Sequence, residues 1–124
     1  MKQGKIVSED GNQEWYQNGL RHRIDGPAYI GVNGNQSWWQ NNQLHRIDGP
    51  AYIRSDGTQA WWQNNQLHRL DGPAYIRTDG SQEWYIKGRR IYLNEWKELH
   101  SITTDWTDWD METKILFRMR FAAG

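Results

Sequence analysis

Residues 40–53 read QNNQLHRIDGPAYI and residues 63–76 read QNNQLHRLDGPAYI, so the chain repeats itself after 23 residues. An earlier copy over residues 17–30 reads QNGLRHRIDGPAYI, and a fourth begins at Gln82 and loses the pattern after Arg90. A fixed period marks an architecture in which one unit cannot bury a core alone and stacks on its neighbours. A side chain present in every copy serves the stacking, whereas a reaction centre normally occurs once. The repeat therefore argues against an enzyme.

Composition narrows the class of protein further. The 124 residues include 15 basic and 15 acidic side chains and no cysteine. Balanced charge disfavours nucleic-acid binding, which needs a concentrated basic surface. Without cysteine there is no disulfide framework and no thiolate zinc site. The first ten residues lack the apolar core of a signal peptide, and no apolar run reaches the ~20 residues that span a bilayer. We therefore expect a cytoplasmic protein without membrane contact.

Two turn signals recur in each copy and predict the strands between them. Asn-Gly and Asp-Gly favour positive φ and close two-residue hairpins of type I′, and Asn-Asn is a weaker version. Short segments between the turns, such as residues 59–63 and 51–54, are rich in strand formers. The first set of turns is Asp10-Gly11, Asn33-Gly34, Asp56-Gly57 and Asp79-Gly80, and the second is residues 18–19, 41–42, 64–65 and 87–88.

These patterns predict a mainly β fold: a single-layer repeat array of short antiparallel β-hairpins with a C-terminal α-helical cap. The array occupies residues 1–90, with a half-repeat at residues 2–9 and copies that begin near residues 11, 34, 57 and 80. The remaining residues, 91–124, form the cap or tail. A terminal element of this kind protects the open end of a repeat sheet.

The tail changes from a strand pattern to a helical one. Apolar residues at 92, 93, 96 and 99 have helical spacing, and Asn94 is the predicted N-cap. Residues 104–121 fit a second helix capped by Thr104 and Asp105, with acidic residues early and basic residues late. Residues 114–121 also alternate with period two, so a strand stays open as the alternative. We favour the helix.

The most enzyme-like string is His-Arg-x-Asp, which occurs three times. A histidine near a carboxylate is a general acid–base couple in principle. Because the string recurs, we interpret it as structural: the aspartate organises the turn, the arginine pairs with it, and the histidine fills space. Equivalent histidines two or three strands apart lie ~10–14 Å from one another, too far to share a zinc ion. We expect no metal and no cofactor. The residues concerned are His22, His45, His68, Asp25, Asp48 and Asp71.

Adjacent aromatic pairs carry the stronger signal for binding. Neighbours on a strand point to opposite faces of the sheet. The first column is tryptophan in every copy, which predicts a structural stack formed by Trp15, Trp38, Trp61 and Trp84. The second column varies, and exposed aromatic stripes mark interaction surfaces. We predict partner binding by Tyr16, Trp39, Trp62 and Tyr85, with Arg54 and Arg77 at the rim. The alternative is that this second face packs under the C-terminal helices or in a dimer.

The unit resembles the MORN repeat, whose pattern is an aromatic, tryptophan, an Asn-Gly turn, a basic residue, histidine and a later Asp-Gly. Trp15, Asn18-Gly19, Arg21, His22 and Asn33-Gly34 match that pattern. Where MORN repeats carry His-Gly-x-Gly, this chain carries His-Arg-x-Asp-Gly-Pro-Ala. That variant looks like the MORN-like proteins of bacteriophages, giant viruses and some bacteria, which often end in a short helix with a Glu-Trp centre. The resemblance covers about residues 5–99 and implies a single-layer sheet that acts as a scaffold.

The function we predict is a non-catalytic protein-binding repeat module. The resemblance adds a phage origin and a protein partner in the host cytoplasm, a host factor such as a defence component that the module sequesters or inhibits. A homodimer is a further expectation. The alternative is a ligand-binding solenoid that stacks a glycan or a nucleotide on its repeated aromatics. A hydrolase would need a site that breaks the repeat, and the clustered acids of residues 105–112 have no histidine closer in sequence than His100.

Overall fold

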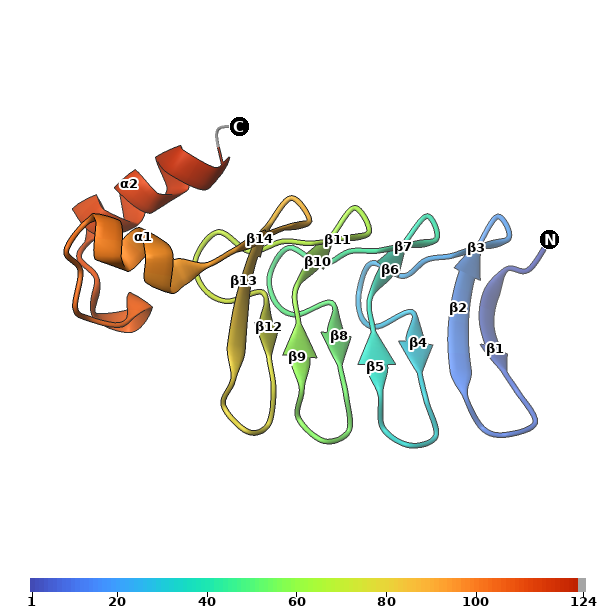
Figure 1. Ribbon diagram of the computed structural model, residues 1–124. Coiled ribbons are helices and arrows are strands. Elements are labelled where there is room, and N and C mark those ends of the chain that lie inside the picture. Colours follow the sequence, from blue (N-terminus) through green and yellow to red (C-terminus); the bar gives the residue numbers. More distant parts are fainter. Residues whose placement is uncertain (123–124) are drawn as a thin grey trace.

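Short antiparallel strands follow one another along the chain, and helices appear only at its C-terminal end (Figure 1). The computed structural model describes residues 1–122. In these residues the main sheet has the order β1-β2-β4-β5-β8-β9-β12-β13-β14, with β3 paired to β2. Each inner repeat adds two strands to this sheet and sends a small hairpin to one end of it, β6-β7 or β10-β11 (Figure 1). The predicted mainly β fold is confirmed.

The strands are short because a turn interrupts the chain every few residues. Their bounds are β1 Gly4–Val7, β2 Gln13–Gln17, β3 Leu20–Arg21, β4 Tyr29–Ile30, β5 Gln36–Ser37, β6 Trp39–Gln40, β7 Gln43–Leu44, β8 Tyr52–Ile53, β9 Gln59–Ala60, β10 Trp62–Gln63, β11 Gln66–Leu67, β12 Tyr75–Ile76, β13 Gln82–Ile86 and β14 Arg89–Ile91. The helices are α1 Leu93–Leu99, the 3₁₀ turn η1 Trp106–Asp108, and α2 Met111–Ala122.

The two kinds of turn differ from one another. Asn41 and Asn42 have φ of 49° and 67°, so this two-residue turn has the positive φ pair of type I′, as predicted. The Asx-Gly turns are longer than predicted. Gly11 N donates to Ser8 O at 3.0 Å, and Ser8 N donates to Asn12 O at 2.9 Å, which closes a three-residue loop. In this turn only the glycine has positive φ, so it forms the bulge of a three-residue hairpin instead of half of a type I′ pair.

Backbone hydrogen bonds tie each small hairpin to the next repeat. Arg23 N donates to Trp39 O at 3.0 Å, and Asn42 N donates to Arg21 O at 2.9 Å. The same two bonds recur 23 and 46 residues later. At the N-terminal end Gly19 N donates to Lys2 O at 2.9 Å, so Lys2 takes the place that Arg21 has one repeat further along. The units are therefore joined by backbone hydrogen bonds through the small hairpins as well as through the main sheet.

The helices enclose a small core at the end of the array. Phe117 is fully buried, and Trp96, Trp106 and Trp109 are each at most 7% exposed. Their rings lie 5.0–5.8 Å apart, within the range of favourable aromatic pairs. The cluster continues onto the last hairpin through Ile86 and Ile91. The cap thus covers the end of the sheet with apolar side chains.

Two predicted caps are wrong, and the second helix is shorter than predicted: α2 covers residues 111–121 of the 104–121 segment, whereas residues 104–110 form a loop with the 3₁₀ turn η1. The preference for helix over strand in residues 114–121 is confirmed. Asn94 lies inside α1, whose N-cap is Tyr92 and has no side-chain hydrogen bond. Asp105 precedes η1 without a side-chain cap bond. The carboxylate of Asp110 accepts instead from Thr113 N at 2.8 Å and so caps the first turn of α2. A single sequence offers several Asx and Thr residues near each helix start, and only backbone geometry selects one.

Candidate binding surface

An arginine covers one side of three of the four structural tryptophans. The Arg23 guanidinium lies 3.9 Å from the ring centre of Trp15, and the equivalent distances for Arg46 over Trp38 and Arg69 over Trp61 are 4.0 and 3.9 Å. Cation–π contacts of this kind contribute about 0.5–1 kcal/mol at partly exposed sites. We call the side of the sheet that carries these pairs the pocket face.

Each of these arginines also closes the Asp-Gly-Pro turn. Arg46 Nε donates to the Asp48 carboxylate at 3.0 Å, and its Nη1 donates to Pro50 O at 3.1 Å. The same two bonds occur at Arg23 and Arg69. In the first copy the hydrogen bond from Arg23 holds the pKa of the Asp25 carboxyl below its ordinary value. The arginine–aspartate pairing expected from the sequence is present in all three copies.

The histidines have a different part from the one predicted. His22 Nδ1 accepts a hydrogen bond from Asn41 N at 3.0 Å, across the junction with the next repeat. His45 and His68 accept in the same way from residues 64 and 87. An imidazole that accepts at Nδ1 is neutral, with its proton on Nε2. The histidines are therefore inter-repeat hydrogen-bond acceptors and not space-filling groups, and each aspartate is bound to arginine instead of histidine.

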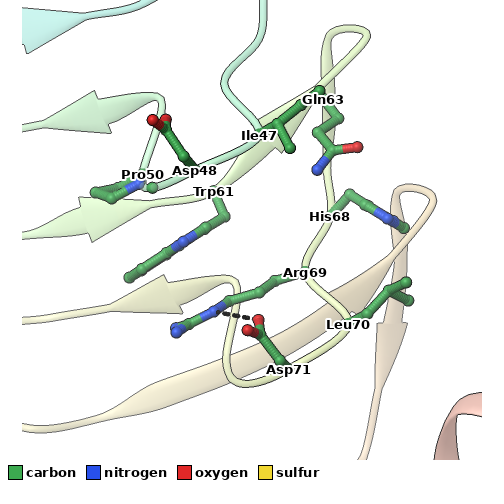
Figure 2. A pocket seen from close by; sticks show the side chains of 10 residues that line it. Ile47, Asp48, Pro50, Trp61, Gln63, His68, Arg69, Leu70 and Asp71 are labelled. Carbon is green, nitrogen blue, oxygen red and sulfur yellow. Dashed lines mark hydrogen bonds and ion pairs between the residues drawn. The ribbon is translucent and has the colours of Figure 1, made fainter.

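Two equivalent pockets open on the pocket face between successive turns. One has a volume of about 550 Å³ and contains Trp61 and Gln63 in its wall (Figure 2). The other, of about 470 Å³, contains Trp38 and Gln40, the same residues one repeat earlier. The wall that both pockets share is Ile47 with Asp48. The repeat thus places two sites of the same chemistry side by side.

Each pocket combines an aromatic surface with polar and aliphatic groups. In Figure 2 the Arg69 guanidinium lies on one side of the Trp61 ring and Pro50 is seen on its other side. Asp71 pairs with Arg69 at 3.2 Å in the same wall. The pocket therefore offers a ring edge, a guanidinium, carboxylates and an amide to a ligand.

Exposed aliphatic side chains stand at the pocket rims. Ile24 is 79% exposed and Ile47 is 77% exposed, although each belongs to a turn that is otherwise polar. Sequence reasoning missed these residues, because the variable position of His-Arg-x-Asp was read as part of a structural turn. The available signal was that this position is aliphatic in all three copies: Ile24, Ile47 and Leu70.

The chain itself covers the third position of this series. The positions 23 residues after Gln63 and His68 are Ile86 and Ile91, and both isoleucines are buried in the cap core. Arg118 Nε from α2 donates to Leu70 O at 3.2 Å. Leu70 is accordingly 37% exposed, about half the value of its two counterparts. Within residues 1–122, the positions of this series at Trp38 and Trp61 stay open.

The predicted binding residues lie on the opposite side of the sheet, which we call the aromatic face. Trp39 and Trp62 are partly buried and pair in register with Leu44 and Leu67. Tyr52 lies between them in the sheet, paired with both Ser37 and Ala60. The centre of this face is therefore apolar, and the small side chains beneath the rings are buried.

Ionic clusters frame the aromatic face at both ends. At the first repeat Glu14 pairs with Arg21 at 2.5 Å and accepts from the Tyr16 hydroxyl at 3.1 Å. At the last repeat Glu83 accepts from Tyr85 at 2.7 Å and pairs with Arg77. The hydrogen bond from Tyr85, and after it the one from Arg77, lower the pKa of Glu83. The same bond to Glu83 raises the pKa of Tyr85. Tyr16 and Tyr85 are thus held by charged neighbours.

The two predicted rim arginines have different surroundings. The Arg77 guanidinium lies 4.6 Å from the ring centre of Tyr75 on the aromatic face and is bound to Glu83. Arg54 occupies the equivalent position one repeat earlier and is exposed. Arg54 is therefore at the edge of this surface, whereas Arg77 belongs to the ionic cluster.

Residues 1–122 contain neither a cluster of metal ligands nor a helix that could span a membrane. No three histidine, aspartate or glutamate side chains there come together as ligands for a metal ion. None of the described helices has the length and apolar character to cross a bilayer.

Comparison of the chain with models of protein families, with curated proteins and with solved structures gives no match.

Proposed function

We propose that the protein is a non-catalytic, MORN-like repeat scaffold that binds a protein partner on its pocket face. The observation that supports this function is the pair of equivalent open pockets rimmed by Ile24 and Ile47. Large aliphatic side chains that stay in solvent on a rigid surface mark interaction sites when they are grouped. The resemblance to phage MORN-like proteins adds the proposal that the partner is a host factor that the scaffold sequesters.

The chemistry of the pockets favours a protein over a polymer of sugars. A protein partner supplies apolar side chains for the spaces on either side of Ile47 and backbone groups for the exposed carboxylates of Asp25 and Asp48. A glycan would use the tryptophan ring and the polar groups, but it would leave the aliphatic rim without a complement. The protein partner therefore satisfies more of the surface.

The hydrogen bonds of the His-Arg-x-Asp string support a non-catalytic role. His45 Nδ1 is used by a backbone N–H, and Asp48 is used by Arg46. A general acid–base couple needs the imidazole and the carboxylate to orient each other. Here both groups are instead bound to the scaffold in every copy.

The test uses one double variant for each face. Tagged wild type, Ile24→Asp/Ile47→Asp and Trp39→Ala/Trp62→Ala are used to isolate bound proteins from bacterial lysate, and affinities are then measured with the purified partner. Far-UV and near-UV circular dichroism first establish that each variant is folded. When the two residues are hot spots, loss of one lowers affinity by about 30-fold and loss of both by about 1,000-fold, because such residues contribute at least ~2 kcal/mol each.

The outcomes separate the candidates. Loss of binding in the isoleucine variant, with binding kept in the tryptophan variant, supports the pocket face. The reverse result moves the site to the aromatic face predicted from the sequence. If no protein binds, but an oligosaccharide quenches tryptophan fluorescence of the wild type, the scaffold binds glycans and the protein-partner proposal is wrong.

A further inference from the structure

Each junction between repeats uses the same pair of outward-facing backbone groups. At the last junction, Arg69 N and Leu67 O bond to the hairpin of the next repeat at 3.0 and 2.9 Å. The groups that come 23 residues later are Tyr92 N and Arg90 O, at the end of strand β14. Within residues 1–122, no backbone group bonds to either of them, and β14 pairs only with β13. The array therefore ends on an edge where one set of junction bonds is not made.

The space beside this edge is open. Figure 1 shows β14 as the last strand of the array, with α1 directly after it. Two pockets, of about 390 and 240 Å³, lie against the edge, and both are lined by Arg90, Ile91 and Tyr92. Ile91 is buried in the cap core, whereas Tyr92 is 58% exposed. The cap thus packs on the last hairpin through Ile91 and leaves space along the edge of β14.

The edge is also basic. Arg89 and Arg90 stand where the two preceding repeats have glutamine and leucine. Arg120 from α2 lines the smaller pocket together with both of them, and among its described residues only Glu95 is acidic. Within residues 1–122, neither Arg89 nor Arg120 belongs to an ion pair. The smaller pocket therefore carries an excess of positive charge.

We propose that β14 receives an extended, acidic segment of a partner protein as an additional strand. The backbone of the segment bonds to Tyr92 N and Arg90 O, as a further repeat would, and its carboxylates pair with the arginines. An added strand gains affinity from backbone bonds and specificity from pockets for its side chains. The smaller pocket, lined by Trp96, Leu99 and Phe121, is below the about 300–1,000 Å³ of small-molecule sites, so its volume suits a single side chain.

The charges also select against other occupants. Charged side chains on an edge strand oppose its pairing with the same strand of another copy, so this chain is disfavoured as its own partner. A nucleic acid requires an extended basic surface, whereas the basic groups here are few and have Glu95 among them. The site goes beyond the function proposed above, because none of the residues around it lines the two pockets of the pocket face.

Two substitutions at Tyr92 test the backbone bond. The fluorescein-labelled peptide EVEFEV is titrated with protein, and its fluorescence polarisation is measured. We expect a dissociation constant on the order of 100 µM for the wild type, because the contact is far smaller than the ~1,200 Å² of a standard interface. Tyr92→Ala removes the ring and keeps the N–H, whereas Tyr92→Pro removes both. Tyr92 has φ of −89° in extended backbone, close to what proline adopts, and circular dichroism establishes that both variants fold. We expect Tyr92→Pro to bind the peptide about tenfold more weakly than Tyr92→Ala.

Methylated peptides test the same bonds from the side of the ligand. A strand presents alternate N–H groups to its two edges, and only one edge faces β14. Methylation of the backbone nitrogens along that edge should weaken binding by about tenfold, whereas methylation along the other edge should change it by less than about threefold. The same effect of both methylations overturns the added strand, as does equal binding by Tyr92→Ala and Tyr92→Pro.

Charge reversal tests the acidic character of the segment. Arg89→Glu/Arg120→Glu should weaken binding of the peptide by about tenfold or more. The matched control Arg54→Glu reverses an exposed arginine elsewhere in the array and should leave binding unchanged. The proposal is wrong if the peptide does not bind the wild type at millimolar protein, or if both variants bind it equally. Tighter binding of an oligothymidylate than of the peptide also overturns it, because the arginines would then form a site for nucleic acid.

Discussion

At the scale of single residues, Arg46 joins three parts of the molecule. Its guanidinium covers Trp38, binds the carboxylate of Asp48, and donates to the carbonyl of Pro50. The turn can close around this group because Gly49 has no side chain. A Cβ on Gly49 would lie 2.9 Å from Arg46 Cζ, closer than real Cβ contacts. Glycine is needed there for space and not for its backbone conformation, because its φ is not in the left-handed region.

Gly49→Ala should therefore destabilise the protein by displacing the arginine. The clash is with the far end of a flexible side chain, so the cost is that of the contacts which Arg46 gives up when it moves, on the order of 1 kcal/mol of unfolding free energy. In an Arg46→Ala background the clash is gone, so the same glycine substitution should change stability by less than about 0.5 kcal/mol. Urea unfolding of the four proteins in this double-mutant cycle gives both values. Equal effects in the two backgrounds would show that Arg46 is not the group that Gly49 accommodates.

His68 makes one junction sensitive to protons. Burial, and then the charge of Lys87, lower the pKa of His68 from its ordinary value near 6.5. The unfolded chain therefore binds this proton more readily than the folded one. The stability contributed by neutral His68 is present above about pH 6.5 and is lost as the pH falls through the lower pKa of the folded state. A protonated imidazole also loses the bond from Lys87 N to Nδ1, which is 2.9 Å long.

We expect the unfolding free energy of the wild type to fall more steeply between pH 7 and pH 5 than that of His68→Gln. The glutamine Oε1 can accept the same backbone bond without titrating, as Gln3 Oε1 does from Asn18 N at 2.6 Å. Thermal unfolding at a series of pH values measures the difference between the two proteins. Parallel pH profiles would rule out this contribution of His68.

At the scale of elements, the sequence predicted the order of strands and helices better than their ends. The 23-residue period and the Asn-Asn turns were sufficient for the array, because two-residue turns between strand formers leave few alternatives. The Asx-Gly loops are one residue longer than predicted, since the residue before Asp-Gly carries no signal of its own. The hydrogen bond of His22 could not be predicted from the sequence, because its partner lies 19 residues away and is a backbone group.

The candidate binding surface was harder to predict than the fold. An aliphatic residue in a repeated turn has the same pattern whether it is buried or, like Ile24, 79% exposed. Binding by the aromatic column stays a prediction, made because large rings dominate hot spots; in the structure Trp39 and Trp62 are partly buried. Burial depends on which faces are covered, and a periodic pattern alone does not contain that information.

The cap provides a matched pair of substitutions on one helix. Phe117→Ala should cost about 3–5 kcal/mol, because it leaves a cavity among Trp96, Trp106 and Trp109. Ile115→Ala, two residues away at a side chain that is 45% exposed, should change the unfolding free energy by less than about 0.5 kcal/mol. Chemical unfolding followed by tryptophan fluorescence compares them. Similar losses for both would contradict the position of Phe117 in the core.

At the scale of the whole molecule, stability is distributed along a row of similar contacts. Each junction uses the same pair of backbone bonds and one side-chain acceptor. Arrays of this kind behave as a sum of units and nearest-neighbour contacts. The length of the array is therefore adjustable, provided that the register at the new junction is conserved.

Deletion of residues 46–68 should leave a folded protein with one repeat fewer. His45 would then precede Arg69, which restores the His-Arg-x-Asp string at the junction. We expect an unchanged type of circular dichroism spectrum, a lower unfolding free energy, and a smaller dependence on urea, since less surface is exposed on unfolding. The matched control removes residues 46–57, half a period, and should not fold. A folded control and an unfolded full-period deletion would contradict the repeat register.

The N-terminal residues form a junction of the same kind as those between repeats. Gln3 takes the position of a histidine and Lys2 that of a strand residue, so the first junction has the shape of the others with an amide in place of an imidazole. This substitution makes the two ends of the array unequal towards acid. The first junction uses an amide, which does not titrate, whereas the last one uses His68, whose pKa is lowered by burial. An acidic compartment would therefore loosen the array beside its cap before it loosens the N-terminal end.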